Sequence, residues 1–256
     1  MLIPVMVTVM VLFTSSSPRE VYIDNRTNTG IYLNVQEKVF PKHWYEKHID
    51  ACTQPLAFGE RGRMIRILNT AFAKYPDRVI RENLTGVYLF RSMKFYGVPY
   101  GGTNFRNYVY LASDETNPNV TDAFVEGVFH HEFSSILLRN HAPEFDRSSW
   151  MRINPPDFRY GSGGTIAIMN GEASLAFDHR LNEQGFLTRY SQSSLEEDVN
   201  MFAQYLFSDQ WEFWSIVELN EKIRQKATLL ISFYHAIDPE FTEDYFRHFY
   251  RRTAAR

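Results

Sequence analysis

Apolar residues recur at helical spacing in several stretches of the chain. Between residues 61 and 75 they fall on one face of a helix, and Pro76 with Asp77 follows as a stop signal. The same spacing predicts helices over residues 195–207, 221–235 and 242–251. The apolar face of the first helix consists of Met64, Leu68, Ala71, Phe72 and Tyr75.

Two runs rich in β-branched and aromatic residues predict strands over 86–96 and 107–112. Residues 31–35 predict a further short strand. The segment 97–102 between the two longer strands is expected to be a loop, and the strands are expected to be neighbours in one sheet. Residues 143–192 contain adjacent prolines and a glycine-serine run, so they are expected to be mostly irregular.

The stretch from Thr121 to Asn140 predicts a central helix, with Thr121 or Asp122 as its N-cap. Its apolar residues cover nearly every side, which is typical of a buried helix. The order of elements therefore predicts an α+β fold, with a small sheet packed on this helix and a mostly helical C-terminal part. Polar residues nevertheless occupy the middle of the helix: His130, His131, Glu132, Ser134 and Ser135.

A buried carboxylate without a partner is costly, so Glu132 and His131 need a cation, water or hydrogen-bonding groups. His131 and Ser135 are four residues apart and share a face of the helix. A histidine and glutamate followed by a second histidine at that spacing form the zincin helix, in which both imidazoles bind Zn²⁺ and the glutamate acts as general base. Here serine occupies the second position, and its short neutral hydroxyl is a poor zinc ligand.

The segment VFHHEFSSILLRN resembles the active-site helix of a family of zinc-binding metallopeptidases found in bacterial cell envelopes, some of them lipoproteins associated with substrate import. The resemblance continues over about residues 107–235 at three further segments, in the same order as in that family. These segments are Pro143–Arg147, Gly185–Tyr190 and Glu196–Ala203. The resemblance implies a zincin-like fold of the gluzincin type.

By this resemblance His131 matches the first zinc ligand and Glu132 the general base. Ser135 takes the position of the lost second ligand. Glu196 matches the third ligand, and shifting the alignment by one residue assigns that role to Glu197 instead. Zinc is the cofactor that the resemblance implies.

Three other histidines could complete or support the site. His130 points about 100° away from His131 around the helix and is expected to be structural. His141 or His179, from the segment after the helix, could supply the missing donor, although nothing in their spacing favours either.

Composition narrows the function further. Hydrophobic residues make up 44% of the 256 residues, which is enough for a core, and the net charge of −3 gives no basic surface for nucleic acid. The one cysteine excludes an internal disulfide and a cysteine-based zinc site. The first fourteen residues are apolar and too short to span a bilayer as a helix, and small residues follow them.

We interpret residues 1–17 as an export signal or leader and residues 18–256 as one domain, placed in the periplasm or cell envelope. A buried N-terminal strand is the alternative for the leader. Two functions remain open. The first is a divergent metallopeptidase-like hydrolase, impaired by the missing imidazole. The second is an inactive pseudo-peptidase that binds a peptide or a glycan. The oligomeric state is left open by the sequence.

Overall fold

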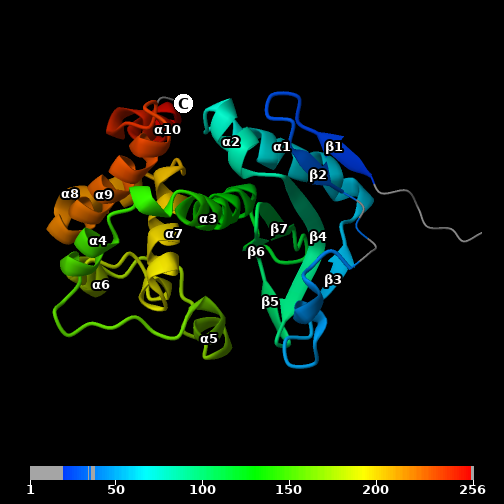
Figure 1. The fold of residues 1–256 in the computed structure, drawn as a ribbon, viewed down its shortest axis with the longest axis horizontal. Coiled ribbons are helices and arrows are strands. Elements are labelled where there is room, and N and C mark those ends of the chain that lie inside the picture. The colour runs from blue at the N-terminus through cyan, green and yellow to red at the C-terminus, as the bar shows by residue number, and fades with distance from the viewer. Residues whose placement is uncertain (1–19, 34, 36–37, 255–256) are drawn as a thin grey trace, which may run out of the picture.

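A mixed β-sheet and a group of helices lie on opposite sides of one long central helix (Figure 1). The computed structural model describes residues 20–33, 35 and 38–254. The predicted leader over residues 1–17 therefore lies outside the described residues. None of the described helices is long and apolar enough to cross a membrane.

The sheet has the strand order β1-β2-β4-β7-β6, with β3 and β5 pairing with the second half of β4. Strands β2, β4 and β7 run parallel to one another, and β6 is antiparallel to β7 at the edge. The strands are β1 (Val21–Ile23), β2 (Gly30–Tyr32), β3 (Cys52–Pro55), β4 (Gly86–Phe95), β5 (Val98–Tyr100), β6 (Gly102–Phe105) and β7 (Tyr108–Ala112).

Alternation along β4 divides the core into two parts, because successive side chains of a strand point to opposite faces. Val87 and Leu89 belong to the main core, which the sheet shares with the helices. Tyr88 and Phe90 point to the other face, where they join a smaller aromatic cluster with Phe40. Both faces of the sheet are therefore covered.

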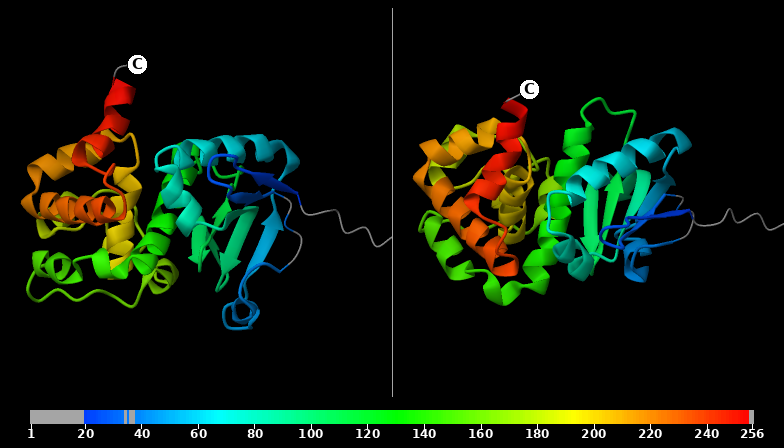
Figure 2. Two further views of the ribbon diagram at one scale, coloured as in Figure 1. Left: turned by 45° about the horizontal axis from the view of Figure 1, so that its top comes forward. Right: turned by 90° about the horizontal axis from the view of Figure 1, so that it is seen from above.

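The helices fall into two groups around α3 (Figure 2). Helices α1 and α2 contact α3 from the side of the sheet, and α7 contacts it from the other side. The helices are α1 (Arg61–Phe72), α2 (Asp77–Asn83), α3 (Asp122–Asn140), α4 (Arg147–Ile153), α5 (Gly164–Met169), α6 (His179–Gln184), α7 (Leu195–Leu206), α8 (Trp211–Leu219), α9 (Glu221–Ile237) and α10 (Glu243–Ala254). Short 3₁₀ turns are η1 (Lys42–Tyr45), η2 (Phe58–Glu60), η3 (Ala142–Glu144) and η4 (Tyr190–Gln192).

The predicted α+β fold is confirmed, including the pairing of the two longer strands as β4 and β7. The prediction of a loop over 97–102 is wrong, because β5 and the start of β6 lie there. The segment 143–192 also contains α4, α5 and α6, each of only six or seven residues. Helices this short have too few turns for a clear apolar period.

Helix α3 is buried along most of its length, as its sequence predicted. The Thr121 side chain accepts a hydrogen bond from the Phe124 amide and begins the helix. Phe129, Phe133 and Ile136 are fully buried. The polar residues in the middle of α3 consequently have to find their partners on neighbouring elements.

A buried ion pair holds the C-terminal helices together. Asp198 on α7 and Lys226 on α9 have fully buried side chains, and their Oδ2 and Nζ atoms are 2.6 Å apart. The same Asp198 oxygen accepts hydrogen bonds from Trp150 Nε1 and the Tyr160 hydroxyl. The carboxylate thereby ties α4 and the segment after it to both helices.

Replacing Lys226 with Met leaves Asp198 buried without a countercharge. We expect Lys226→Met to lower the free energy of unfolding by about 3–5 kcal/mol. The double variant Asp198→Asn/Lys226→Met keeps an oxygen acceptor for Trp150 and Tyr160, so most of this loss should be regained. Urea titrations followed by circular dichroism measure both values. Lys222→Met, on the same helix, is the matched control, and an equal loss in that control would contradict the explanation.

Candidate functional site

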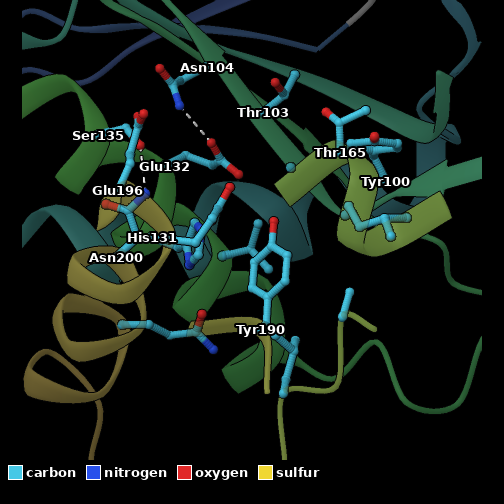
Figure 3. Close-up of a pocket in the computed structure, with 18 of the residues that line it drawn as sticks. Tyr100, Thr103, Asn104, His131, Glu132, Ser135, Thr165, Tyr190, Glu196 and Asn200 are labelled. Atoms are coloured by element: carbon cyan, nitrogen blue, oxygen red, sulfur yellow. Dashed lines mark hydrogen bonds and ion pairs between the residues drawn. The ribbon is translucent and has the colours of Figure 1, made fainter. Parts of the chain in front are cut away.

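A cavity of about 400 Å³ opens between the sheet edge and the C-terminal helices (Figure 3). Its lining comes from β5 and β6, from α3, from α5 and from α7. His131, Glu132 and Ser135 all face it from α3. The face of α3 that the sequence singled out therefore forms part of the wall of this cavity.

His131 is paired with Glu197 across the cavity. Its Nε2 lies 2.8 Å from Glu197 Oε2, and its side chain is only 10% exposed. Burial lowers the pKa of His131, but the hydrogen bond and negative charge of Glu197 outweigh burial and raise it above its ordinary value. The pair is therefore stabilised as an imidazolium facing a carboxylate.

Glu132 has a different partner. Its Oε2 accepts a hydrogen bond of 2.8 Å from Asn104 Nδ2 on β6. Arg139, two turns further along α3, donates to the Asn104 oxygen and so fixes the orientation of the amide. Burial raises the pKa of Glu132 to about 7, although the charge of His131 and the Asn104 hydrogen bond lower it. A carboxyl group with this pKa exchanges its proton near neutral pH.

Ser135 is tied to α7. Its hydroxyl oxygen accepts a hydrogen bond of 2.6 Å from Asn200 Nδ2, and the residue is 2% exposed. Asn200 is three residues after Glu197, so one turn of α7 supplies partners for both ends of the zincin motif. The hydroxyl therefore has a protein partner at the position where the related helices carry an imidazole.

The edge of the sheet approaches α3 closely at Gly102. A Cβ atom at this position would collide with the Val128 side chain and crowd the Glu132 side chain. The absence of a side chain at Gly102 therefore allows β6 to lie directly against the turn of α3 that carries Glu132.

Tyr190 closes the opposite side. Its ring stacks on the His131 imidazole with centroids 6.1 Å apart. Gly164, the first residue of α5, packs against the Tyr190 hydroxyl and Glu197 so tightly that a Cβ there would overlap both. Burial and the nearby charge of Glu197 raise the pKa of Tyr190 well above its ordinary value, so the phenol stays neutral.

The structure brings some of the predicted residues together and not others. His131, Glu132 and Ser135 meet in the cavity, and Glu197 rather than Glu196 is bonded to His131. Glu196 is exposed at the cavity rim, and its role as a ligand stays a prediction. Within the described residues, no group of three or more histidine, cysteine, aspartate or glutamate side chains is arranged to hold a metal ion.

The other histidines lie elsewhere. His130 is fully buried and bonded to the Tyr75 hydroxyl, and burial lowers its pKa to about 4, so it is a neutral structural residue as expected. His141 is bonded to Asn83 at the end of α3, and His179 is exposed at the start of α6. Neither lines the cavity.

Two residues of the site were not singled out by the sequence. Asn104 belongs to β6, a strand that the sequence did not predict. Tyr190 ends one of the segments that carried the family resemblance, which was the available signal for it.

The raised pKa of Glu132 predicts how the stability of the folded protein changes with pH. The carboxyl is neutral in the folded protein up to about pH 7, whereas in the unfolded chain it ionises near pH 4.5. Folding therefore disfavours the ionised carboxylate. As a result, the free energy of unfolding falls as the pH rises from about 5 to 8. We expect Glu132→Gln to gain stability relative to the wild type over this range, measured as the difference in Tm with a chelator present. Asn104→Leu should raise the pKa of Glu132 further, and a lower pKa in a ¹³C NMR titration would contradict this account.

Comparisons with known proteins bear on the fold and on the family of this chain. A family model described as "Putative zinc-binding metallo-peptidase" matches residues 92–241. A crystal structure of a putative zinc-binding metallo-peptidase from Bacteroides caccae ATCC 43185 is similar in fold, with a TM-score of 0.58 and 17% sequence identity. The match covers 89% of this chain and 86% of that one. Among curated proteins no significant match is found. Since the family model spans more than half of the sequence, this chain belongs to the zinc-binding metallopeptidase family that the model describes.

Proposed function

We propose that this protein is a catalytically inactive member of its family that binds an extended peptide in the cleft between β6 and α3. The observation that carries the proposal is the hydrogen bond between Ser135 and Asn200, which occupies the position of the second zinc ligand. Placement in the cell envelope is part of the proposal, and it rests on the apolar first residues and on the resemblance to envelope proteins.

The donor set does not fit catalytic zinc. Such sites normally use three protein ligands and keep the fourth position for water. Here His131 and Glu197 face each other, Glu196 lies at the cavity rim, and the Ser135 hydroxyl is engaged by Asn200. Within the described residues no three such side chains are arranged to hold a metal ion.

The sheet edge supports peptide binding. Among the described strands β6 pairs with β7 alone. The Ala112 amide bonds to the Gly101 carbonyl, and hydrogen-bonded pairs alternate along an antiparallel ladder. This parity turns the backbone groups of Gly102 and Asn104 away from β7 and toward the cavity. An extended peptide can therefore add to β6 as a further strand.

Metal-dependent hydrolysis is the competing function. In its favour, Glu132 has a pKa of about 7, which suits a general base. Within the described residues, however, no three side chains are arranged to hold the kind of cation that lowers the pKa of water in metallopeptidases. Zinc analysis separates the two functions.

The first test restores the imidazole. We expect the wild type to retain no stoichiometric zinc after dialysis against micromolar Zn²⁺ and to leave peptide substrates intact. In Ser135→His/Asn200→Ala the second substitution makes room for the imidazole beside His131. This variant should bind zinc at least about tenfold more tightly, because each added imidazole ligand strengthens the site. Isothermal titration and elemental analysis measure the change.

The matched control is Ser135→Ala/Asn200→Ala, which opens the same space without adding a donor. It should bind zinc no better than the wild type. Stoichiometric zinc in the wild type, together with peptide hydrolysis that Glu132→Gln abolishes, would overturn the proposal in favour of the enzyme.

The second test addresses strand pairing directly. Pairing with β6 uses every second amide group of the peptide, so N-methylation of those groups should weaken binding strongly while N-methylation of the intervening ones should not. Fluorescence anisotropy with a series of peptides, each methylated at one position, measures this two-residue period. Binding that is equally sensitive at every position would contradict strand addition.

A further inference from the structure

A second hollow, of about 180 Å³, lies beside the cleft on the other face of β6. Three of its residues, Tyr100, Thr103 and Thr165, also line the cleft, so the two spaces share a wall. The remaining walls are largely aromatic. They are Trp44, Ile49, Phe95 and Tyr96.

One face of β6 is turned toward α3 and the cleft, and the other is turned toward the second hollow. Asn104 contacts Glu132, and Gly102 lies against α3, so even-numbered positions face the helix. Thr103 lines the second hollow, and Phe105 packs edge-to-face on Trp44, so odd-numbered positions face the aromatic side. A peptide paired with β6 alternates in the same way. Every second side chain of that peptide points to the aromatic side of β6, and the one beside Thr103 lies at the hollow.

Tyr96 lies at the rim of this hollow in an unusual backbone conformation. It begins the two-residue turn between β4 and β5, and its φ of 55° is followed by 75° at Gly97. Two positive φ angles define the type I′ hairpin turn, where Asn-Gly is strongly preferred. A tyrosine there is uncommon and costs backbone energy, and the residue is 36% exposed. Asparagine would suit this turn better than tyrosine does. The backbone therefore gives no reason for a tyrosine, and the aromatic ring is the distinctive feature of the position.

We propose that this hollow is a specificity subsite that takes an aromatic side chain of the peptide bound along β6. The inference rests on the proposed peptide-binding function and deepens it. Phe95 already meets Trp44 and Tyr100 edge-to-face, with centroids 5.4 and 5.0 Å apart. An inserted aromatic ring extends this cluster with the same geometry, which aromatic pairs favour over simple apolar contact. Main-chain pairing supplies the affinity, and the hollow supplies the selection.

The test uses a set of threonine-rich nonapeptides that carry a single tyrosine, leucine or alanine at each position in turn. At positions of one parity, the tyrosine peptides should bind the full chain about tenfold more tightly than the alanine peptides, as expected for one well-packed aromatic contact. The leucine peptides should fall between them. Fluorescence anisotropy gives the Kd values.

The decisive variant is Tyr96→Asn, because asparagine suits the turn while removing the ring. It should keep or raise the Tm, leave the alanine peptides unaffected and reduce the tyrosine preference to less than about threefold. Phe58→Asn is the matched control, since Phe58 is 81% exposed and outside both hollows. It should keep the full preference.

The outcomes are distinguishable. Peptide binding with no aromatic preference, or a preference that survives Tyr96→Asn, overturns the subsite and leaves the proposed function standing. Absence of binding by every peptide overturns the proposed function and the subsite together. Cellotetraose that competes with the tyrosine peptides and loses its binding in Tyr96→Asn would also overturn the subsite, because the rings would then be a platform for sugars.

Discussion

The cleft depends on one constraint: a helix that is buried on nearly all sides carries charged and polar groups in its middle. Polar groups inside a protein must be satisfied by other groups. Those in the cleft are satisfied by two neighbouring elements, β6 and α7. Glu132 reaches the sheet edge through Asn104, while His131 and Ser135 reach α7 through Glu197 and Asn200. These bonds fix the position of α3 relative to the sheet and to the C-terminal helices.

Much of the fold could be predicted because its main elements carry strong local patterns. Helix α3 is apolar around its circumference, and β4 and β7 are rich in β-branched and aromatic residues. The local sequence of each element therefore predicts whether it is a helix or a strand. Strand β6 could not be predicted, because Gly102–Phe105 is short and has no apolar alternation. Its extended conformation comes from pairing with β7. Because β6 was not predicted, Asn104 and the edge of the sheet could not be assigned to the site.

The site residues on α3 could be predicted from the sequence, but the rotation of α7 about its own axis could not. Glu196 and Glu197 are adjacent, so their side chains differ by about 100° around the helix, and local sequence does not choose between them. The choice is made by Asp198. This residue points into the C-terminal core, where Lys226, Trp150 and Tyr160 bind its carboxylate. Once that contact is fixed, Glu197 turns to His131 and Glu196 lies at the exposed rim of the cavity. The partners of Asp198 are distant in sequence, so only the tertiary structure contains this information.

The contacts among the cleft residues bear on whether the stability of the fold depends on metal ions. Many metal sites leave several anionic ligands close together, and the apo form is then strained by their repulsion. Here His131 is paired with Glu197, and the amides of Asn104 and Asn200 bind Glu132 and Ser135. If the cleft binds a peptide and no metal, as we propose, these contacts alone hold α3 against its neighbours. The stability of the fold is then independent of the zinc concentration.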